Sequence, residues 1–418
     1  YTEVVAFTAA QIPDIDDRVY PASLAGELYP RGIPIHAEEK LEDLIREHKV
    51  DYCVFAYSDV SNAFIGEMAQ RVDAAGSDFK TINSRRTMLK SKKPVVSVVA
   101  VRTGCGKSQT SRAVCRMLTE AGKKVAVLRH PMPYGDLEHQ AVQRFDTLED
   151  LKRHKCTIEE IEEYEPHIRA GAVVCAGIDY KMIVKSAEKY ADVLIWDGGN
   201  NDASFLVPNL SICVTDPLRA GHELSHFPSL VNLKTADIVV ISKVDSATKR
   251  QIETIEKNIA IHNPEAVVVR SLTLFTMRPS GCSICDFRKF RVLVVEDGPT
   301  TTHGNMSHGA GYVAARQLSV KKILNPRTYA VGLLKEAYAD YPHIGDVVPA
   351  LGYGEQQLAD LEATINAADC DAVIIGTPIQ LQLYVKIDKP ILNVQYDIDE
   401  SAGSAIRERL VEKGIINC

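Results

Sequence analysis

The residues most clearly able to do chemistry lie in a glycine-rich turn, residues 104–108 (GCGKS). The turn follows residues 95–101, which are all apolar except Ser97, as in a parallel strand buried on both faces, and it precedes a helical pattern. A strand, such a turn, Lys-Ser and a helix together form a phosphate-binding P-loop, in which backbone amides and Lys107 hold phosphate oxygens. We predict that the nucleotide is bound by Arg102, Thr103, Gly104, Cys105, Gly106, Lys107, Ser108 and Gln109.

The P-loop departs from the usual G-x-x-x-x-G-K-[ST] spacing, because Val101 stands where the first glycine would be. The shorter G-x-G-K-S form occurs in nucleotide-dependent ligases and metal-inserting GTPases. A plain turn closing a βα unit is the alternative, and the strand and helix on either side favour the P-loop. Cys105 lies at the start of the helix, where we expect an acidified thiol that is sensitive to oxidation.

A second strand pattern, residues 193–196, ends in Asp197 and is followed by Gly198 and Gly199. A carboxylate at such a strand end can hold Mg²⁺ beside a P-loop, while a following glycine approaches the γ-phosphate. We therefore predict Ser108 and Asp197 as magnesium ligands. An aspartate that only closes a turn is the alternative.

Other strand patterns end in loops that carry polar residues, at the sheet edge where α/β proteins bind ligands. Arg129 begins one such loop, Arg219 lies in a second, and a third follows the strand pattern 291–296. By contrast, we expect the helical segment 157–168 (TIEEIEEYEPHI) to show an acidic face to solvent, with only Glu165 and His167 able to point inward.

Two further motifs leave the cofactor open. Lys243-x-Asp245 follows a strand pattern, as does the element with which GTPases recognise guanine, but Ser242 replaces the usual Asn or Thr, so ATP and GTP both remain possible. Cys282 and Cys285 form a single C-x-x-C. Such a pair either binds Zn or an Fe–S cluster with ligands from elsewhere, or has no metal role.

Composition restricts the class of protein. The 418 residues are 45% hydrophobic and 25% charged, which is ordinary for a soluble protein, and the net charge of −7 argues against a nucleic-acid partner. The sequence has no apolar run of membrane-spanning length and no signal-peptide pattern, so we expect no membrane association. The ten cysteines are scattered, which indicates reduced thiols and a cytoplasmic protein.

Strand and helix patterns alternate along the chain, which predicts an α/β fold. We expect a central P-loop NTPase-type parallel sheet in residues 93–290. It would be flanked by an N-terminal Rossmann-like domain, residues 1–92, and a C-terminal βα domain, residues 291–418. Because the chain begins inside a strand-like run, we expect the first strand of the N-terminal domain to be absent from this numbering.

The ordered motifs resemble the cyclic 2,3-diphosphoglycerate synthetase family. They are residues 101–108 (VRTGCGKS), 129–136 (RHPMPYGD), 196–202 (WDGGNND), 295–300 (VEDGPT), 302–304 (THG) and 367–372 (AADCDA). The resemblance covers essentially the whole chain. It implies an ATP- and Mg²⁺-dependent ligase, cytoplasmic and homodimeric, that closes an intramolecular phosphoanhydride in 2,3-diphosphoglycerate.

A substrate of this kind, a small polyanionic acid, needs several cationic groups around it. We predict its binding residues to be Arg129, His130, Asp136, Arg219, His222, Thr302 and His303. The predicted catalytic residues are Lys107, Arg129, His130, Asp197 and His303, where His303 either binds a phosphoryl group or accepts one.

Two other functions remain open. A GTPase that acts as a switch or metallochaperone, loading a metal or cofactor into a partner protein, would explain the short P-loop, Lys243-x-Asp245 and the C-x-x-C. A nucleotide-gated binding module is the third possibility. The additional domains on either side of the P-loop region favour the ligase.

Overall fold

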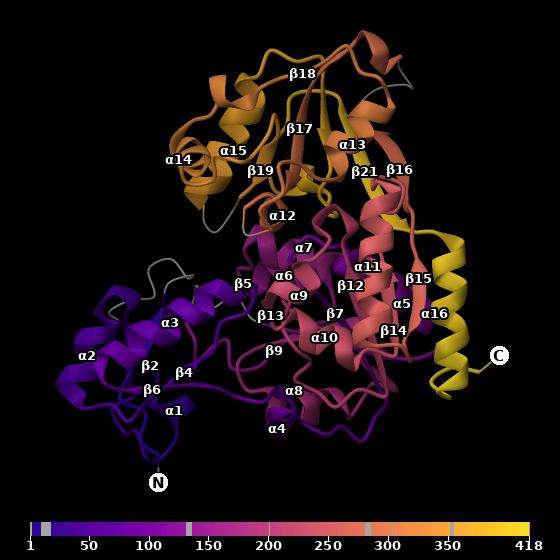
Figure 1. Cartoon of the computed structure of the whole chain (residues 1–418). Coiled ribbons are helices and arrows are strands. Elements are labelled where there is room, and N and C mark those ends of the chain that lie inside the picture. The colour runs from indigo at the N-terminus through magenta and orange to yellow at the C-terminus, as the bar shows by residue number, and fades with distance from the viewer. Residues whose placement is uncertain are drawn as a thin grey trace.

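The computed structural model describes residues 2–9, 18–130, 136–199, 201–280, 286–302, 304–351 and 355–417. The chain forms an α/β protein with three regions, which Figure 1 shows as an N-terminal lobe in indigo, a central sheet, and a C-terminal sheet in orange and yellow. The C-terminal sheet lies above the central one, and the final helix runs back down beside it.

The central region has an eight-stranded sheet in the order β15-β14-β12-β7-β11-β8-β10-β9. Every neighbouring pair is parallel except β9 and β10. Its elements are β7 (Val95–Ala100), α5 (Lys107–Glu120), β8 (Val125–Arg129), β9 (Gln143–Phe145), α6 (Leu148–Arg153), α7 (Ile158–Arg169), β10 (Val173–Ala176), α8 (Tyr180–Ala187), β11 (Val193–Asp197), β12 (Leu210–Thr215), α9 (His222–Ser225), β13 (His226–Phe227), α10 (Ser229–Thr235), β14 (Ile238–Ile241), α11 (Lys249–His262) and β15 (Val267–Arg270).

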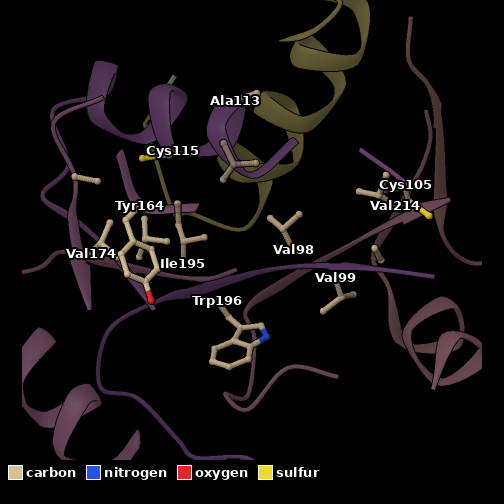
Figure 2. Packing of buried hydrophobic residues seen from close by; sticks show 14 of the residues in the cluster. Val98, Val99, Cys105, Ala113, Cys115, Tyr164, Val174, Ile195, Trp196 and Val214 are labelled. Carbon is tan, nitrogen blue, oxygen red and sulfur yellow. The ribbon is translucent and has the colours of Figure 1, made fainter. Parts of the chain in front are cut away.

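Burial explains why the strand before the P-loop is valine-rich. All six residues of β7 are buried, because β11 and β12 flank the strand and other elements cover both faces. Figure 2 shows Val98 and Ile195 on one side of this sheet and Val99 and Trp196 on the other. A fully buried valine contributes about 1.5–3 kcal/mol, so this strand holds the following turn firmly in place.

The N-terminal region has two small sheets instead of one continuous sheet, with the orders β1-β3-β2 and β4-β6. β5 pairs with β13, so this region is joined to the central one by a two-stranded sheet. Its elements are β1 (Phe7–Ala9), β2 (Val19–Tyr20), α1 (Ala22–Ala25), β3 (Ile33–Ala37), α2 (Leu41–His48), β4 (Tyr52–Phe55), β5 (Val60–Ser61), α3 (Asn62–Ala75), β6 (Asp78–Thr81) and α4 (Ser84–Thr87).

The C-terminal sheet has the order β16-β21-β20-β17-β18, and β19 also pairs with β17. β16 therefore belongs to this sheet, although it precedes residue 290, the boundary predicted from sequence. The elements are β16 (Thr273–Ser280), β17 (Arg291–Asp297), α12 (Gly298–Thr301), α13 (Ala310–Gln317), β18 (Lys322–Ile323), α14 (Gly332–Asp340), β19 (Val348–Ala350), α15 (Glu355–Ala367), β20 (Ala372–Ile375), β21 (Ile391–Ile398) and α16 (Glu400–Glu412).

Candidate active site

The turn after β7 has the backbone of a phosphate-binding loop. Gly104 and Gly106 adopt φ values of +76° and +98°, a left-handed conformation that side chains other than glycine rarely take. α5 begins at Lys107, so its first backbone N–H groups have no partner within the helix. The loop can therefore present amides to an anion at the positive end of a helix.

A buried ionic cluster lies beside the loop. Asp197 accepts hydrogen bonds from Lys107 Nζ at 2.5 Å and His167 Nε2 at 3.1 Å, and it pairs with Arg129 Nη1 at 2.7 Å. Burial alone would raise the pKa of Asp197, but Arg129, Lys107 and His167 hold it well below its usual value. Arg129 also pairs with Glu163 of α7. Asp197 is thus an ionised carboxylate at the strand end, a form that can act as a metal ligand.

The predicted magnesium ligands provide hard oxygen donors, a hydroxyl from Ser108 and the carboxylate of Asp197, which suit Mg²⁺. Ser108 lines the same cavity as Lys107, which contacts Asp197. The described residues alone do not form a cluster of three or more His, Cys, Asp or Glu side chains placed to bind a metal. Cys282 and Cys285 lie outside the described residues.

The expectation of a reactive thiol in the loop is wrong. Cys105 is completely buried, and its burial raises the pKa of the thiol to about 11, although Arg219 and Lys243 lower it in part. The positive end of α5 does not overcome this loss of hydration. Cys105 therefore packs against the sheet as an apolar residue.

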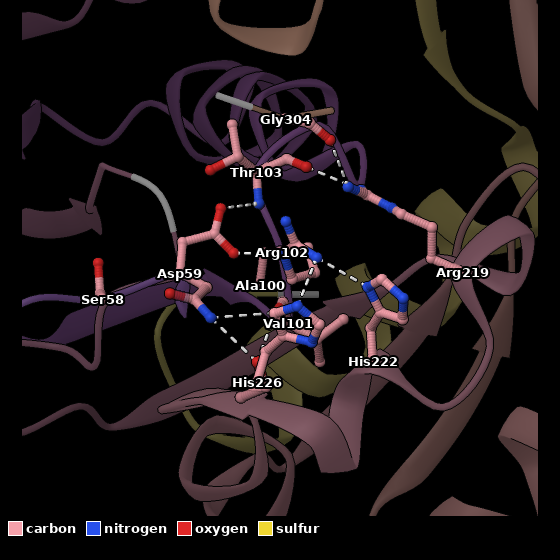
Figure 3. Close-up of polar contacts among 12 residues, drawn as sticks. Ser58, Asp59, Ala100, Val101, Arg102, Thr103, Arg219, His222, His226 and Gly304 are labelled. Carbon is pink, nitrogen blue, oxygen red and sulfur yellow. Dashed lines mark hydrogen bonds and ion pairs between the residues drawn. The ribbon is translucent and has the colours of Figure 1, made fainter. Parts of the chain in front are cut away.

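Arg102 is fixed between the N-terminal and central regions. Its Nε donates to Asp59, and its Nη1 lies 2.8 Å from His222 Nδ1 and 2.9 Å from His226 Nε2. Asp59 also accepts from the backbone N–H of Thr103 at 3.0 Å. Figure 3 shows this group, with Arg102 at its centre. His222 thus contacts the P-loop through Arg102.

Arg219 and Lys243 hold the loop from the other side. Arg219 donates to the carbonyls of Thr103 at 2.7 Å and Gly304 at 2.8 Å, which ties the P-loop to the C-terminal region (Figure 3). Lys243 donates to the carbonyl of Gly104 at 2.5 Å, and both cations pair with Asp216. These two side chains thus bind backbone carbonyls and the Asp216 carboxylate.

Asp245, the proposed guanine-binding carboxylate, is exposed and accepts from the backbone N–H of Thr273 at 3.0 Å. Lys243 and Ser246 line the cavity beside the P-loop, but Asp245 is not among the residues that line it. Asp136 is also exposed and bonds to the His139 ring at 2.7 Å, away from that lining. Both remain sequence-based predictions of binding residues.

His130 is held by protein groups on both ring nitrogens. Nε2 lies 2.6 Å from Asp202 Oδ2, and Nδ1 lies 2.6 Å from the Tyr180 hydroxyl. Asp202 also accepts from Ser58 of the N-terminal region at 2.5 Å. Burial would raise the pKa of Asp202, but His130 and Ser58 lower it to about 2. The His130 ring is therefore locked in one orientation.

A cavity of about 860 Å³ joins these parts. The P-loop residues Arg102–Thr103–Gly104 and Gly106–Gln109 line it, together with Arg129, Thr302, and Ser58 and Asp59 of the N-terminal region. Thr302 is buried, and its hydroxyl donates to the Gly298 carbonyl at 2.9 Å. His303 lies outside the described residues. The phosphate loop thus opens into a chamber shared by all three regions.

Besides Asp59, four carboxylates form part of the cavity lining, and we call these four the acidic wall: Glu159, Glu163, Glu296 and Asp297. Glu296 accepts backbone N–H groups of Gly309, Gly311 and Tyr312 at 3.0, 3.0 and 2.7 Å. Because these amides at the start of α13 are already occupied by a carboxylate, this stretch of the loop after β17 is less suited to an anion than the sequence indicated.

Burial sets the electrostatics of the acidic wall. It raises the pKa of Glu296 to about 7 and that of Asp297 to about 6, with Glu163 adding to the effect on Asp297. Behind the wall, burial and the neighbouring Asp297 raise the pKa of Glu162 well above its usual value. A cationic ligand beside these groups would stabilise their ionised forms.

The prediction that α7 faces solvent is wrong. Glu159, Glu160 and Glu162 are buried, at 2–4% exposure, and only the burial of Glu165 and His167 agrees with the prediction. The reason is that the C-terminal region covers the helix, as the hydrogen bond of 2.7 Å from Tyr384 to Glu165 shows. Periodicity within the helix does not reveal this, because the covering residues are distant in sequence.

The comparisons with known proteins identify one full-length relative. The chain is 52% identical over 417 residues to a curated protein named arginine synthetase ArcE, from Thermococcus kodakarensis, a match that covers 100% of this chain and 92% of the relative. No established family profile matches the chain.

Among solved structures, LpxK from Aquifex aeolicus in complex with ATP aligns with a TM-score of 0.46 and 14% identity, over 84% of this chain and 97% of LpxK. The hydrogenase maturation factor HypB from Archaeoglobus fulgidus aligns with a TM-score of 0.28 and 16% identity, over 43% and 80%. Within the described residues, none of the helices has both the length and the apolarity to cross a membrane.

Proposed function

The chain belongs to the family of the arginine synthetase ArcE, and we propose that it uses a nucleoside triphosphate to synthesise arginine. The observation that carries this proposal is one cavity with two chemically different ends, a phosphate loop and an acidic wall. The first end suits a triphosphate, and the second suits a substrate whose reacting group becomes a cation.

The chemistry of a guanidino group explains why a triphosphate is needed. The ureido group of citrulline differs from the guanidino group of arginine by one oxygen in place of one nitrogen, and that oxygen is a poor leaving group. Transfer of the γ-phosphoryl group to the ureido oxygen breaks the β–γ phosphoanhydride and releases the nucleoside diphosphate. Ammonia then attacks the carbon and loses a proton, and phosphate leaves.

The phosphate end would act by positioning and charge neutralisation. We propose that the amides of residues 104–108 and Lys107 hold the triphosphate and that Arg129 faces the transferred group. Ser108 and Asp197 would hold Mg²⁺, which neutralises phosphate charge when bound. Lys107 and Arg129 both contact Asp197 in this structure, so the two cations lie beside a predicted magnesium ligand.

The acidic wall would favour the second half of the reaction. As ammonia replaces the phosphorylated oxygen, the ureido carbon centre acquires positive charge. Asp297 would stabilise this charge, together with Glu163, whose carboxylate also pairs with Arg129. A guanidinium donates five hydrogen bonds in a fork that matches carboxylates. Both carboxylates are only partly exposed, which strengthens this interaction compared with a fully solvated site.

The second candidate is the formation of cyclic 2,3-diphosphoglycerate, which is supported by the motif resemblance across the whole chain. The basic residues Lys107, Arg129 and Lys243 line the cavity and would attract such a polyanion. Against it, the carboxylates of the acidic wall line the same chamber and would repel phosphate groups. We therefore place arginine synthesis first.

The test measures nucleoside diphosphate formation from ATP and from GTP, with citrulline plus ammonium or with 2,3-diphosphoglycerate. We expect citrulline and ammonium together to stimulate turnover, with arginine detected by amino-acid analysis, and with neither stimulating alone to the same extent. Stimulation by 2,3-diphosphoglycerate with a cyclic product in the ³¹P spectrum would establish the second candidate instead. Turnover unaffected by either mixture would contradict both.

A further inference from the structure

Arg102 is held in place by three side chains and keeps part of its guanidinium available. The side chain is about 5% exposed, and the residue lines the cavity next to the P-loop. Its Nε is taken by Asp59 and its Nη1 by His222 and His226. Its Nη2 makes no hydrogen bond to any residue that the structure describes, so two N–H donors remain for a ligand.

The two histidines are arranged to accept, because a guanidinium can only donate hydrogen bonds. His222 must present the lone pair of Nδ1 and His226 that of Nε2, and the rings stack with centroids 4.4 Å apart. Burial and the charge of Arg102 lower the pKa of both rings. Figure 3 shows the two rings meeting the same end of Arg102. They fix its orientation without neutralising its charge.

Asp59 brings the N-terminal region into this arrangement. Besides pairing with Arg102, its carboxylate accepts the N–H of Thr103, and its own N–H donates to the Phe227 carbonyl at 2.9 Å. The adjacent β5 pairs with β13, which contains His226. The N-terminal region and the histidine pair therefore position Arg102 as one unit.

We propose that Nη2 of Arg102 binds the phosphoryl group during its transfer. Asp59, His222 and His226 are then positioning residues for Arg102. This rests on the proposed function. As the bond between the γ-phosphorus and the bridging oxygen breaks and the bond to the acceptor oxygen forms, charge spreads over the equatorial oxygens, and a fixed guanidinium stabilises it. Arg102 donates hydrogen bonds throughout and gains or loses no proton. The requirement for Asp59 gives the N-terminal region a role in catalysis.

An alternative anion for Nη2 is the α-carboxylate of the amino-acid substrate, and the experiment separates the two. ADP with aluminium fluoride mimics a planar phosphoryl group, whereas ADP alone does not. We expect wild-type protein to form a long-lived complex with ADP and aluminium fluoride, and Arg102→Lys to weaken it at least tenfold while changing the affinity for ADP alone less than threefold. Arg144→Lys, whose arginine pairs with Asp146 at the surface, is the matched control.

The positioning role has its own readout. Asp59→Asn and His226→Asn should lower kcat about tenfold with little change in the KM of ATP, and neither should lower kcat further in the Arg102→Lys background. Asp146→Asn is the control.

An aluminium fluoride complex as tight in Arg102→Lys as in the wild type would overturn the proposal. So would a variant that alters only the KM of the amino acid, which would assign Nη2 to the α-carboxylate. Wild-type protein that fails to bind ADP at all would contradict the proposed function and this inference with it.

Discussion

Carboxylate pKa values are shifted in opposite directions at the phosphate end of the cavity and at the acidic wall. At the phosphate end, Arg129, Lys107 and His167 surround Asp197 and hold its pKa well below its usual value. At the acidic wall, burial raises the pKa of Glu296 to about 7 and that of Asp297 to about 6, because cations nearby do not compensate for lost hydration. At the phosphate end, protein cations compensate the charge of Asp197 without a ligand. At the acidic wall, a positively charged ligand would stabilise the ionised forms of Glu296 and Asp297.

The largest effect should come from Lys107→Ala. We expect nucleoside-triphosphate turnover to fall at least about 100-fold, because a preorganised charge at the transferred group is lost. Lys152→Ala, at an exposed position, is the control and should retain wild-type turnover. Single-turnover measurement of ADP release checks this, and wild-type rates in Lys107→Ala would refute the assignment of the phosphate end.

Glu163→Gln tests the acidic wall, because its expected effect on the kinetics differs between a citrulline-like and a polyanionic substrate. Removal of one negative charge from the acidic wall should lower kcat with citrulline and ammonium about tenfold, since the positive charge develops only during the reaction and a charge-assisted contact to it contributes about 1.5 kcal/mol or more. For a polyanionic substrate the same change should lower the KM. Glu149→Gln, at an exposed position, controls for the loss of charge alone. Steady-state kinetics with each substrate decides between the two.

The stability of the phosphate end should depend on pH through His226. Burial and Arg102 lower the pKa of this ring from 6.5 to about 4, while His222 and Arg219 also disfavour its protonation and Asp59 favours it. The contribution of the neutral His226 ring to the free energy of unfolding is therefore complete above about pH 6.5, and it declines as the pH falls toward 4. We expect less than about 1 kcal/mol per pH unit, because the ring is partly exposed and solvent screens it.

Denaturant unfolding at pH 7, 6 and 5 measures this dependence. His226→Asn should unfold with a smaller change in stability over the same range, and a variant with the wild-type slope would show that another group is responsible.

The smallest effect should come from Asp136→Asn. Asp136 is exposed, bonds to the neighbouring His139 and does not line the cavity. We expect kcat and KM to change less than twofold, measured by steady-state kinetics. A tenfold rise in the KM of the substrate would instead support the sequence-based prediction that Asp136 contacts it.

The features that the sequence predicted are those formed by residues close together in the chain. The P-loop lies within one strand, one turn and one helix, so its pattern and backbone are specified by consecutive residues. Asp197 was placed correctly at the end of β11, because strand ends in a parallel sheet meet at one edge. The α/β class followed from the alternation of strand and helix patterns.

The acidic wall could not be found in this way. Glu159 and Glu163 come from α7, whereas Glu296 and Asp297 come from β17, and the fold brings all four to the lining of one cavity. In sequence, the glutamates of α7 have the spacing of a solvated helix face. Asp59 gave no signal either, because its partner Arg102 lies in another region of the fold. Such pairs arise only from tertiary packing.

The central claim is that one chamber holds the triphosphate at the P-loop and the amino-acid side chain at the acidic wall. A crystal structure of the protein with ADP, magnesium and arginine tests it most directly. We predict the β-phosphate on the amides of residues 104–108 and the guanidinium of arginine within hydrogen-bond distance of Glu163 or Asp297. Arginine bound outside this chamber, or its guanidinium directed away from all four carboxylates, would contradict the account.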